Sequence, residues 1–194
     1  MIIAMTGQKR SGKDTVAQFI RDKYDFEPVA FAGTLKGMMR LLLQSAGMSD
    51  KDIEYYMEGY GKEIGIPALQ GKSCRYAMQK LGTEWRDFMG AKLWSDIAKM
   101  KVDSVDDAII TDMRFLHEGD YVDEEGGTKV RVRRAGQTIA ADAHPSETEM
   151  EKIIVDATIF NFGSLSDLQQ VTDIFAYALI NNQDLATVAK EWFN

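Results

Sequence analysis

The sequence predicts an α/β fold, in which a mostly parallel sheet of about five strands carries helices on both faces. Two observations support this prediction. Short apolar runs typical of buried strands alternate along the chain with segments of helical periodicity. A glycine-rich turn joins the first apolar run to the first helical segment, and in α/β folds such a turn is a common place for phosphate to bind.

The individual elements follow from these patterns in chain order. Short apolar or alternating runs predict strands over 1–6, 29–32, 108–111, 128–134 and 157–161. Helical spacing predicts helices over 15–24, 35–46, 73–81, 84–100, 115–125 and 164–182, and Ser73 is expected to cap the third of these. The glycine-rich segment 49–72 predicts a short helix followed by irregular backbone, and the polar segment 135–147 predicts a loop.

The composition limits the class of protein. A length of 194 residues suits one domain, and the net charge of −7 argues against a general nucleic-acid binder. Cys74 is the single cysteine, which excludes an internal disulfide and a multi-cysteine zinc site. No apolar run approaches the roughly 20 residues that a membrane-spanning helix needs. We therefore expect a cytoplasmic protein with neither a membrane nor a nucleic-acid partner.

The turn over residues 7–15, with the sequence GQKRSGKDT, carries the strongest functional signal. It matches the P-loop pattern G-x-x-x-x-G-K, after a strand and before a helix. Gly7 and Gly12 permit backbone angles that let the loop wrap around a phosphate, and the helix N-terminus favours an anion. Lys13 supplies an ammonium for the β- and γ-phosphates of a nucleotide. The alternative interpretation is a glycine-rich turn without a ligand.

One position of this turn departs from the usual pattern. Asp14 stands where a serine or threonine hydroxyl normally binds Mg²⁺, and Thr15 follows it. Asp14 could hold Mg²⁺ directly or through water, and Thr15 could bind an α- or β-phosphate oxygen. The nucleotide-binding residues predicted in the turn are Gly7, Lys9, Arg10, Ser11, Gly12, Lys13, Asp14 and Thr15.

Several segments, spread over most of the chain, resemble the bacteriophage deoxynucleoside monophosphate kinases. They are KRSGKDT at 9–15, AGTLK at 32–36, RYAMQKLGTE at 75–84, Trp94, TDMR at 111–114 with His117 and Glu118, RAG at 134–136, HPSE at 144–147 and NFGSL at 161–165. The chain departs from the family pattern at Ala135, where proline is common, and in its short glycine-rich segment between residues 44 and 72.

The resemblance implies a fold like that of P-loop nucleoside monophosphate kinases, with one domain over 1–194. It implies an acceptor-binding helical region at about 36–100 and a lid at about 134–147. The implied reaction is the ATP-dependent phosphorylation of deoxynucleoside 5′-monophosphates to diphosphates, with Mg²⁺ as cofactor, which supplies DNA precursors. The implied partners are these small molecules, a homodimer is permitted, and a phage-encoded protein would act in the host cytoplasm.

The resemblance also implies site residues. The catalytic set is Lys13, Asp112, Arg114 and Arg134, and the further nucleotide-binding residues are Arg133, Asn161 and Gly163. The acceptor set is Lys36, Arg75, Gln79, Thr83, Glu84, Trp94, Asp112, Arg114 and Glu118, and the residues expected to hold Mg²⁺ are Asp14 and Asp112. Arginine suits phosphate because it can donate two parallel hydrogen bonds.

Each of these residues also has a structural interpretation. Lys36 could be a solvated surface lysine, and Arg131, Arg133 and Arg134 could be solvated charges on one face of a strand. Arg75 with Gln79 could be a surface pair on one helical face. Thr83 with Glu84, and the turn at 161–164, could be helix caps. Trp94 could be core packing, Asp112 with Arg114 an ion pair, and Glu118 part of a solvated acidic face.

Two other functions remain open at this point. One is another small-molecule kinase on the same scaffold, acting on phosphomevalonate or dephospho-coenzyme A. The other is a P-loop nucleotide-binding protein that is not a kinase, although the chain lacks the N-K-x-D motif that reads guanine. An assay with a panel of acceptors would distinguish these functions.

Overall fold

A computed structural model of the protein describes residues 1–137, 148–185 and 188. The chain divides into two compact units, one made of Met1–Ala30 with Lys101–Asn194 and the other of Phe31–Met100. The acceptor-binding region predicted at about 36–100 and the lid predicted at about 134–147 are functional assignments, and they stay predictions. Residues 138–147 of that lid, including His144, lie outside the described residues.

The first unit contains a five-stranded sheet whose pairings are all parallel, which confirms the predicted α/β class. Its strands lie in the order β2 (Glu27–Val29), β5 (Ala108–Ile110), β1 (Ile2–Thr6), β6 (Thr128–Arg134) and β7 (Ala157–Asn161). Because the strands are parallel, their carboxyl ends meet at one edge of the sheet. The P-loop, the turn after β5 and the turns after β6 and β7 all leave from this edge.

Helices cover both faces of this sheet, as the alternating side chains of β6 demonstrate. Val130 and Val132 belong to an apolar cluster that also holds Val16 and Ile20 of α1 (Lys13–Tyr24) and Leu168 of α8 (Leu165–Ile180). The side chains of Lys129 and Arg131 point to the other face, toward α6 (Leu116–Glu124) and the short 3₁₀ helix η3 (Met150–Lys152). None of the described helices combines the length and apolar character of a membrane crossing.

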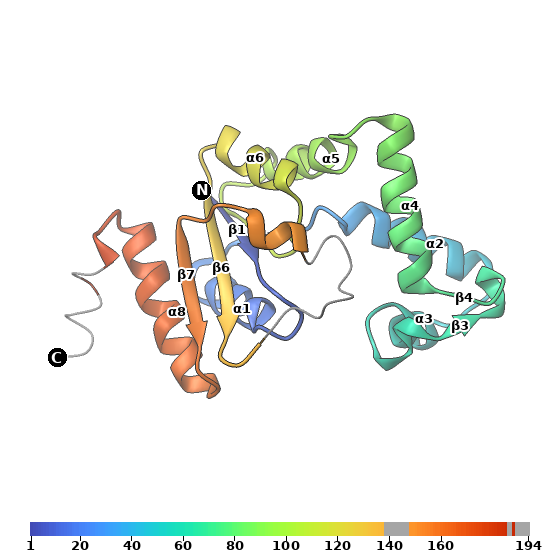
Figure 1. Ribbon diagram of the computed structural model, residues 1–194, viewed down its shortest axis with the longest axis horizontal. Coiled ribbons are helices and arrows are strands. Elements are labelled where there is room, and N and C mark those ends of the chain that lie inside the picture. The colour runs from blue at the N-terminus through green and yellow to red at the C-terminus, as the bar shows by residue number, and fades with distance from the viewer. Residues whose placement is uncertain (138–147, 186–187, 189–194) are drawn as a thin grey trace. The chain divides into compact units, whose positions relative to one another are not determined.

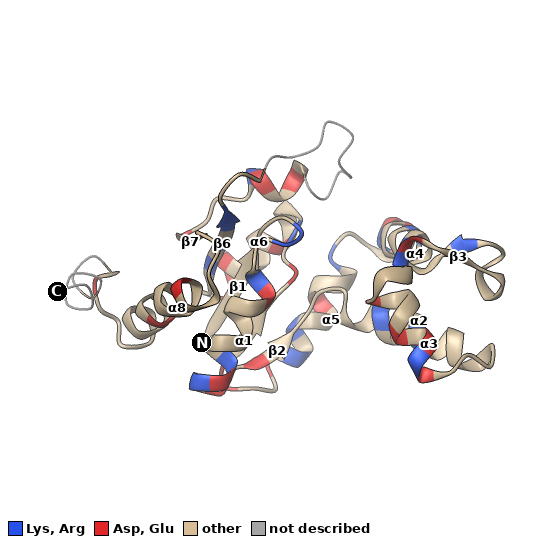
Figure 2. Ribbon diagram, turned by 90° about the horizontal axis from the view of Figure 1, so that it is seen from below, with Lys and Arg blue, Asp and Glu red and all other residues tan. Residues whose placement is uncertain are grey.

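Lys129 and Arg131, on the second face of β6, are buried, whereas Arg133 on the same face is exposed. Figure 2 shows the lysine and arginine positions of β6 in blue. The interpretation of this strand as one with solvated charges is therefore wrong for Arg131 and fits only the end of the strand. The Lys129 ammonium lies 2.5 Å from the Asp123 carboxylate of α6. The Arg131 guanidinium donates to the carbonyls of Met150 at 2.9 Å and Ile153 at 2.8 Å. Burial lowers the pKa of Arg131, and nearby Glu151 partly opposes that shift. Arg131 therefore holds η3 against the sheet.

The second unit is mainly helical and has its own core. It contains α2 (Gly33–Ser45), α3 (Asp50–Met57), α4 (Cys74–Met89) and most of α5 (Leu93–Val102). Two short 3₁₀ helices, η1 (Tyr60–Glu63) and η2 (Pro67–Leu69), and a two-stranded antiparallel ladder of β3 (Gly65–Ile66) with β4 (Lys72–Ser73) occupy the glycine-rich segment. The core residues are Met39, Leu43, Ile53, Met57, Ile66 and Cys74.

Two predicted boundaries are wrong. The first is the boundary between the helices predicted at 73–81 and 84–100. α4 runs without a break through Gly82 and Thr83, and the division between the two helices lies near Gly90. Thr83 and Glu84 therefore lie inside a helix and cap nothing, whereas the Ser73 side chain does accept a hydrogen bond at the helix start. The second strand spans Glu27–Val29, ahead of the predicted 29–32, and residue 33 already begins α2.

Candidate active site

The P-loop connects β1 to α1 with a backbone that tolerates little change. Gly7 has a φ of 150°, and a Cβ there would lie 2.4 Å from the Val132 carbonyl oxygen. Gly12 has a φ of 104°, and a Cβ there would lie 2.7 Å from the Asn161 side-chain nitrogen. Arg10 adopts a left-handed φ of 67°, which non-glycine residues rarely do. Such strained conformations cluster at functional sites.

The polar groups of the loop are arranged to receive an anion. Within the described part of the chain, the backbone N–H groups of Arg10 and Gly12 donate to no partner. Gly12 also precedes α1, whose N-terminus carries a partial positive charge. The Lys13 ammonium is 12% exposed and lies 3.1 Å from the exposed Asp14 carboxylate. A phosphate would replace that carboxylate with a stronger anionic partner.

A cleft of about 330 Å³ lies beside this loop. Its lining comes from the P-loop, the end of β6 and the β7–α8 connection: Arg10, Gly12, Lys13, Asp14, Thr15, Arg134, Asn161, Gly163, Ser164, Leu165 and Leu168. Arg10 and Arg134 have no carboxylate partner among the described residues. With Lys13 they give the cleft three cations against one carboxylate, so it suits a polyanionic ligand.

Most of the predicted nucleotide-binding residues thus come together, although their roles stay predictions. Gly7, Lys9 and Ser11 belong to the loop but do not line the cleft. Arg133 is also outside the lining, and its guanidinium pairs with the Glu151 carboxylate at 2.7 Å. The sequence interpretation missed Leu165 and Leu168 as lining residues, since their spacing indicates only an amphipathic helix.

Asp112 and Arg114 follow β5 in a turn that Glu118 holds in place. The Glu118 side chain is 5% exposed, and one carboxyl oxygen accepts the N–H groups of Arg114 at 2.6 Å and Phe115 at 3.0 Å. Burial and then the Asp112 charge raise the pKa of Glu118 to about 8, against the lowering effect of these hydrogen bonds and of Arg114. The solvated-face interpretation of Glu118 is therefore wrong, and its contact with an acceptor stays a prediction.

Glu149 adds a second support to this turn that the sequence did not indicate. Its carboxylate accepts the N–H of Leu116, the first residue of α6, at 3.0 Å. Carboxylates stabilise helix N-termini because they compensate the free N–H groups there. Glu118 and Glu149 thus hold the start of α6, and with it the turn that carries Asp112 and Arg114.

The other predicted acceptor residues lie in the second unit. Lys36 pairs with Glu58 at 2.8 Å and Arg75 with Glu63 at 3.1 Å, so both cations are neutralised by carboxylates of the α3–η1 segment. Gln79 is half-buried on α4, and Thr83 and Glu84 are exposed on the same helix.

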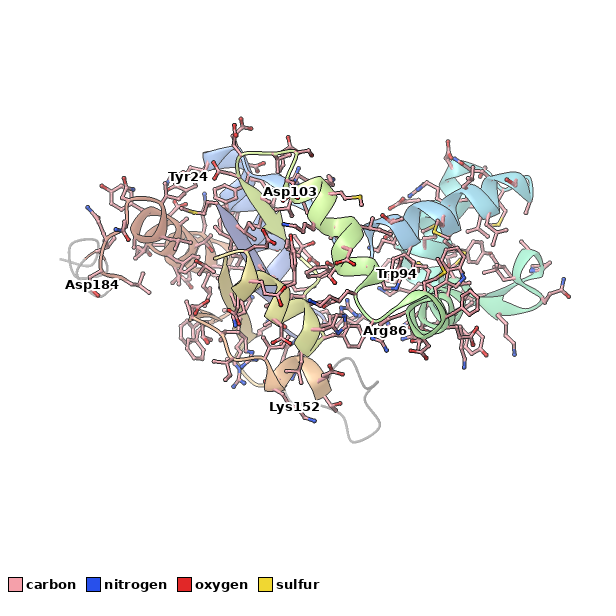
Figure 3. All side chains as sticks on the ribbon, turned by 90° about the horizontal axis from the view of Figure 1, so that it is seen from above. Tyr24, Arg86, Trp94, Asp103, Lys152 and Asp184 are labelled. Carbon is pink, nitrogen blue, oxygen red and sulfur yellow. The ribbon has the colours of Figure 1, made fainter. Side chains whose placement is uncertain are left out.

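Trp94, labelled in Figure 3, is 8% exposed and belongs to the same unit. Its indole N–H donates to the Gly82 carbonyl at 2.8 Å, and its ring stacks on Trp85. Trp94 therefore packs in the second unit, and its contact with an acceptor stays a prediction.

The donor set limits how a metal could bind. Among the described residues there is no group of three histidine, cysteine, aspartate or glutamate side chains that could hold a metal ion. Mg²⁺, however, commonly binds through one or two carboxylates together with substrate phosphates. The Asp14 carboxylate, 79% exposed in the cleft lining, fits that mode of binding.

The parallel sheet, the phosphate loop at its centre and the cationic cleft beside that loop define a P-loop nucleotide-binding protein. The model of the deoxynucleotide monophosphate kinase family matches residues 1–66 and 67–172. The chain therefore belongs to the deoxynucleotide monophosphate kinase family, and it is a kinase. A protein of Acanthamoeba polyphaga mimivirus named "Putative deoxynucleotide monophosphate kinase" is 30% identical over 168 residues, covering 79% of this chain and 83% of its own length.

Two solved kinase structures are also similar to this chain. Shikimate kinase from Aquifex aeolicus has a TM-score of 0.46 at 13% identity, covering 94% of this chain and 98% of its own. Dephospho-CoA kinase from Campylobacter jejuni has a TM-score of 0.47 at 13% identity, covering 92% and 96%. Likenesses at this level carry no argument about substrate.

Proposed function

We propose that this protein transfers the γ-phosphoryl group of ATP to deoxynucleoside 5′-monophosphates and so forms the diphosphates that feed DNA synthesis. The observation that carries the proposal is the cleft beside the P-loop. There the N–H groups of Arg10 and Gly12, which donate to none of the described residues, and the side chains of Lys13 and Arg134 offer donors and positive charge to a polyphosphate. Family membership supports the choice of acceptor.

Phosphoryl transfer requires positioning and positive charge more than covalent chemistry. We assign Lys13 to the β- and γ-phosphates and Arg134 to the charge that develops on the transferred group. Asp14, with Asp112 as a second candidate, would hold Mg²⁺, which neutralises phosphate charge when bound. The attacking oxygen of the acceptor phosphate is already ionised near neutral pH, so no strong general base is needed.

On the acceptor side, we assign Arg114 and Asp112 to the reacting end of the acceptor, on the turn that Glu118 and Glu149 hold. Lys36 and Arg75 would exchange their partners Glu58 and Glu63 for the acceptor phosphate. The remaining proposed acceptor contacts are Gln79, Thr83, Glu84, Trp94 and Glu118. We propose a lid at about 134–147 and an acceptor region at about 36–100, and these small molecules as the partners.

A phosphoryl-transfer assay with ATP and Mg²⁺ tests the proposal. The acceptors are the four deoxynucleoside monophosphates and their ribose counterparts, with dephospho-coenzyme A and phosphomevalonate as alternatives. We expect diphosphate formation from at least one deoxynucleotide. Transfer only to an alternative acceptor would replace the proposed substrate, and ATP turnover that no acceptor accelerates would overturn transfer altogether.

Two variants make the assay specific for the P-loop. Lys13→Ala should abolish transfer without lowering the melting temperature, because the exposed Asp14 carboxylate is the one contact of its ammonium among the described residues. Lys23→Ala is the matched control, since Lys23 lies at the other end of α1 and pairs with Asp173 at 3.1 Å. Transfer at the wild-type rate in Lys13→Ala would remove the P-loop from the reaction.

A further inference from the structure

A loop that presents its N–H groups to a phosphate must point carbonyl groups elsewhere, where donors from the rest of the protein can reach them. Two carbonyls of this P-loop receive hydrogen bonds from side-chain amides of distant residues. The Asn161 nitrogen donates to the Ser11 carbonyl at 2.9 Å, and the Gln137 nitrogen donates to the Lys9 carbonyl at 3.0 Å. The Lys9 carbonyl shares a peptide unit with the Arg10 N–H, and the Ser11 carbonyl shares one with the Gly12 N–H. Both of these peptide units are therefore held by side chains from outside the loop.

Asn161 has both ends of its amide engaged within the protein. Its nitrogen bonds Ser11, and its oxygen accepts the N–H of Gly163 at 3.0 Å. The side chain is 6% exposed, so its orientation is determined by these two partners. A role for Asn161 in positioning the loop therefore accounts for its contacts better than the predicted direct hydrogen bond to nucleotide.

Gln137 links the P-loop to the segment that carries Arg134. β6 ends at Arg134, and Figure 1 shows that β6 lies beside β7. The Ala135 N–H donates to the Asn161 carbonyl at 3.2 Å. The Gln137 N–H then closes a turn onto the Arg134 carbonyl at 3.3 Å. The Gln137 side chain reaches from this turn to Lys9, so the segment is tied to β7 at one end and to the P-loop at the other.

We propose that Asn161 and Gln137 are positioning residues that hold the P-loop in its phosphate-binding conformation before the nucleotide arrives. They accomplish this by bonding the Ser11 and Lys9 carbonyls, which leaves the N–H groups of Arg10 and Gly12 available to phosphate. The proposal rests on the proposed function only in taking ATP as the ligand. Preorganisation of this kind raises affinity because the ordering of the loop is completed before binding.

The test is a binding measurement by calorimetry, with ATP and with inorganic tripolyphosphate as probes. Gln137→Met keeps the length of the side chain and removes its donor, and Asn161→Leu does the same at the buried position. We expect the Kd of both probes to rise about tenfold in Gln137→Met, the effect of one lost hydrogen bond. Gln18→Ala, which removes an amide donor to Asp22 on α1, should leave both Kd values unchanged.

A merely structural role would not produce this pattern. If Gln137 positions the loop, the KM for ATP rises while the KM for the acceptor and the melting temperature without nucleotide stay near wild type. Equal Kd values for wild type and Gln137→Met, or a loss of ATP binding without a matching loss for tripolyphosphate, would overturn the inference for Gln137. Asn161→Leu tests the bond to the Ser11 carbonyl in the same way. A rise in the Kd of both probes supports the role of Asn161, and unchanged Kd values would overturn it.

The binding assay also separates this inference from the proposed function. Wild-type protein that binds both probes but transfers no phosphoryl group would contradict the proposed function and leave the inference about the loop intact. Wild-type protein that binds neither probe would overturn both.

Discussion

Replacing Glu118 with glutamine should change how the stability of the protein depends on pH. Burial and the Asp112 charge raise the pKa of the folded-state carboxyl to about 8, from an ordinary value of 4.5. Between these two values the unfolded chain releases a proton that the folded protein keeps. The free energy of unfolding therefore falls as the pH rises through this range, and it levels off above the folded-state pKa.

The size of the effect follows from the same two values. The free energy of unfolding falls by about 1.4 kcal/mol per pH unit, so the Glu118 carboxyl removes ~4 kcal/mol between pH 5 and pH 8. This is a large part of a typical domain stability of about 5–15 kcal/mol. In Glu118→Gln the side-chain oxygen can still accept the N–H groups of Arg114 and Phe115, but there is no proton to lose. The stability of this variant relative to wild type should therefore increase by ~4 kcal/mol over the range.

Urea denaturation of both proteins from pH 5 to pH 9 measures this difference, in which the contributions of other titrating groups largely cancel. Asp120→Asn is the control, because it replaces an exposed carboxylate on the same helix and leaves Glu118 in place. A flat profile for Glu118→Gln would mean that Glu118 is ionised in the folded protein. Its hydrogen bonds with the backbone would then outweigh burial, and the reasoning would be refuted.

Three further substitutions test single contacts by urea denaturation. Gly7→Ala should lose about 2–4 kcal/mol of stability, because its Cβ would lie 2.4 Å from the Val132 carbonyl at a positive φ; a wild-type midpoint would contradict this backbone. Arg131→Met should lose about 3 kcal/mol of stability, since it leaves the carbonyls of Met150 and Ile153 without their donor. Stability equal to wild type would mean that water replaces the guanidinium. Ser73→Ala should lose about 1 kcal/mol, with Ser73→Asp restoring the cap on the Tyr76 N–H; equal stability of all three proteins would exclude a capping role.

The sequence predicted best those parts of the fold in which one local pattern decides the outcome. The strands at 128–134 and 157–161 have the predicted bounds, and Ser164 caps the last helix, which begins one residue after its predicted start. The wrong boundary near Gly82 has a tertiary cause. A Cβ at Gly82 would lie 3.1 Å from the Leu35 side chain, so this glycine allows α2 to approach α4 and does not interrupt the helix. The second strand includes Pro28, ahead of its predicted start, and proline is tolerated there because β2 is an edge strand.

The candidate site was predictable only where a motif marks it. The P-loop and the ends of β6 and β7 were visible in the sequence, and they line the cleft. Gln137 was not, because it lies in a polar stretch without periodicity and acts through a bond to a backbone atom 128 residues away. The burial of Glu118 and Arg131 was also missed, since charged residues in amphipathic elements usually face solvent and their burial depends on tertiary partners.

The strand order has a consequence for how the chain is made. Ile2 pairs with Ala108 and Ile3 with Thr128, so the opening strand is translated long before either of its neighbours. On a ribosome that adds about 5–20 residues per second, it waits on the order of 5–20 s for its first partner. The Phe31–Met100 unit is complete within that interval, because its core residues all precede β5. The nascent polypeptide thus carries the apolar strand β1 without a sheet partner until β5 has been made.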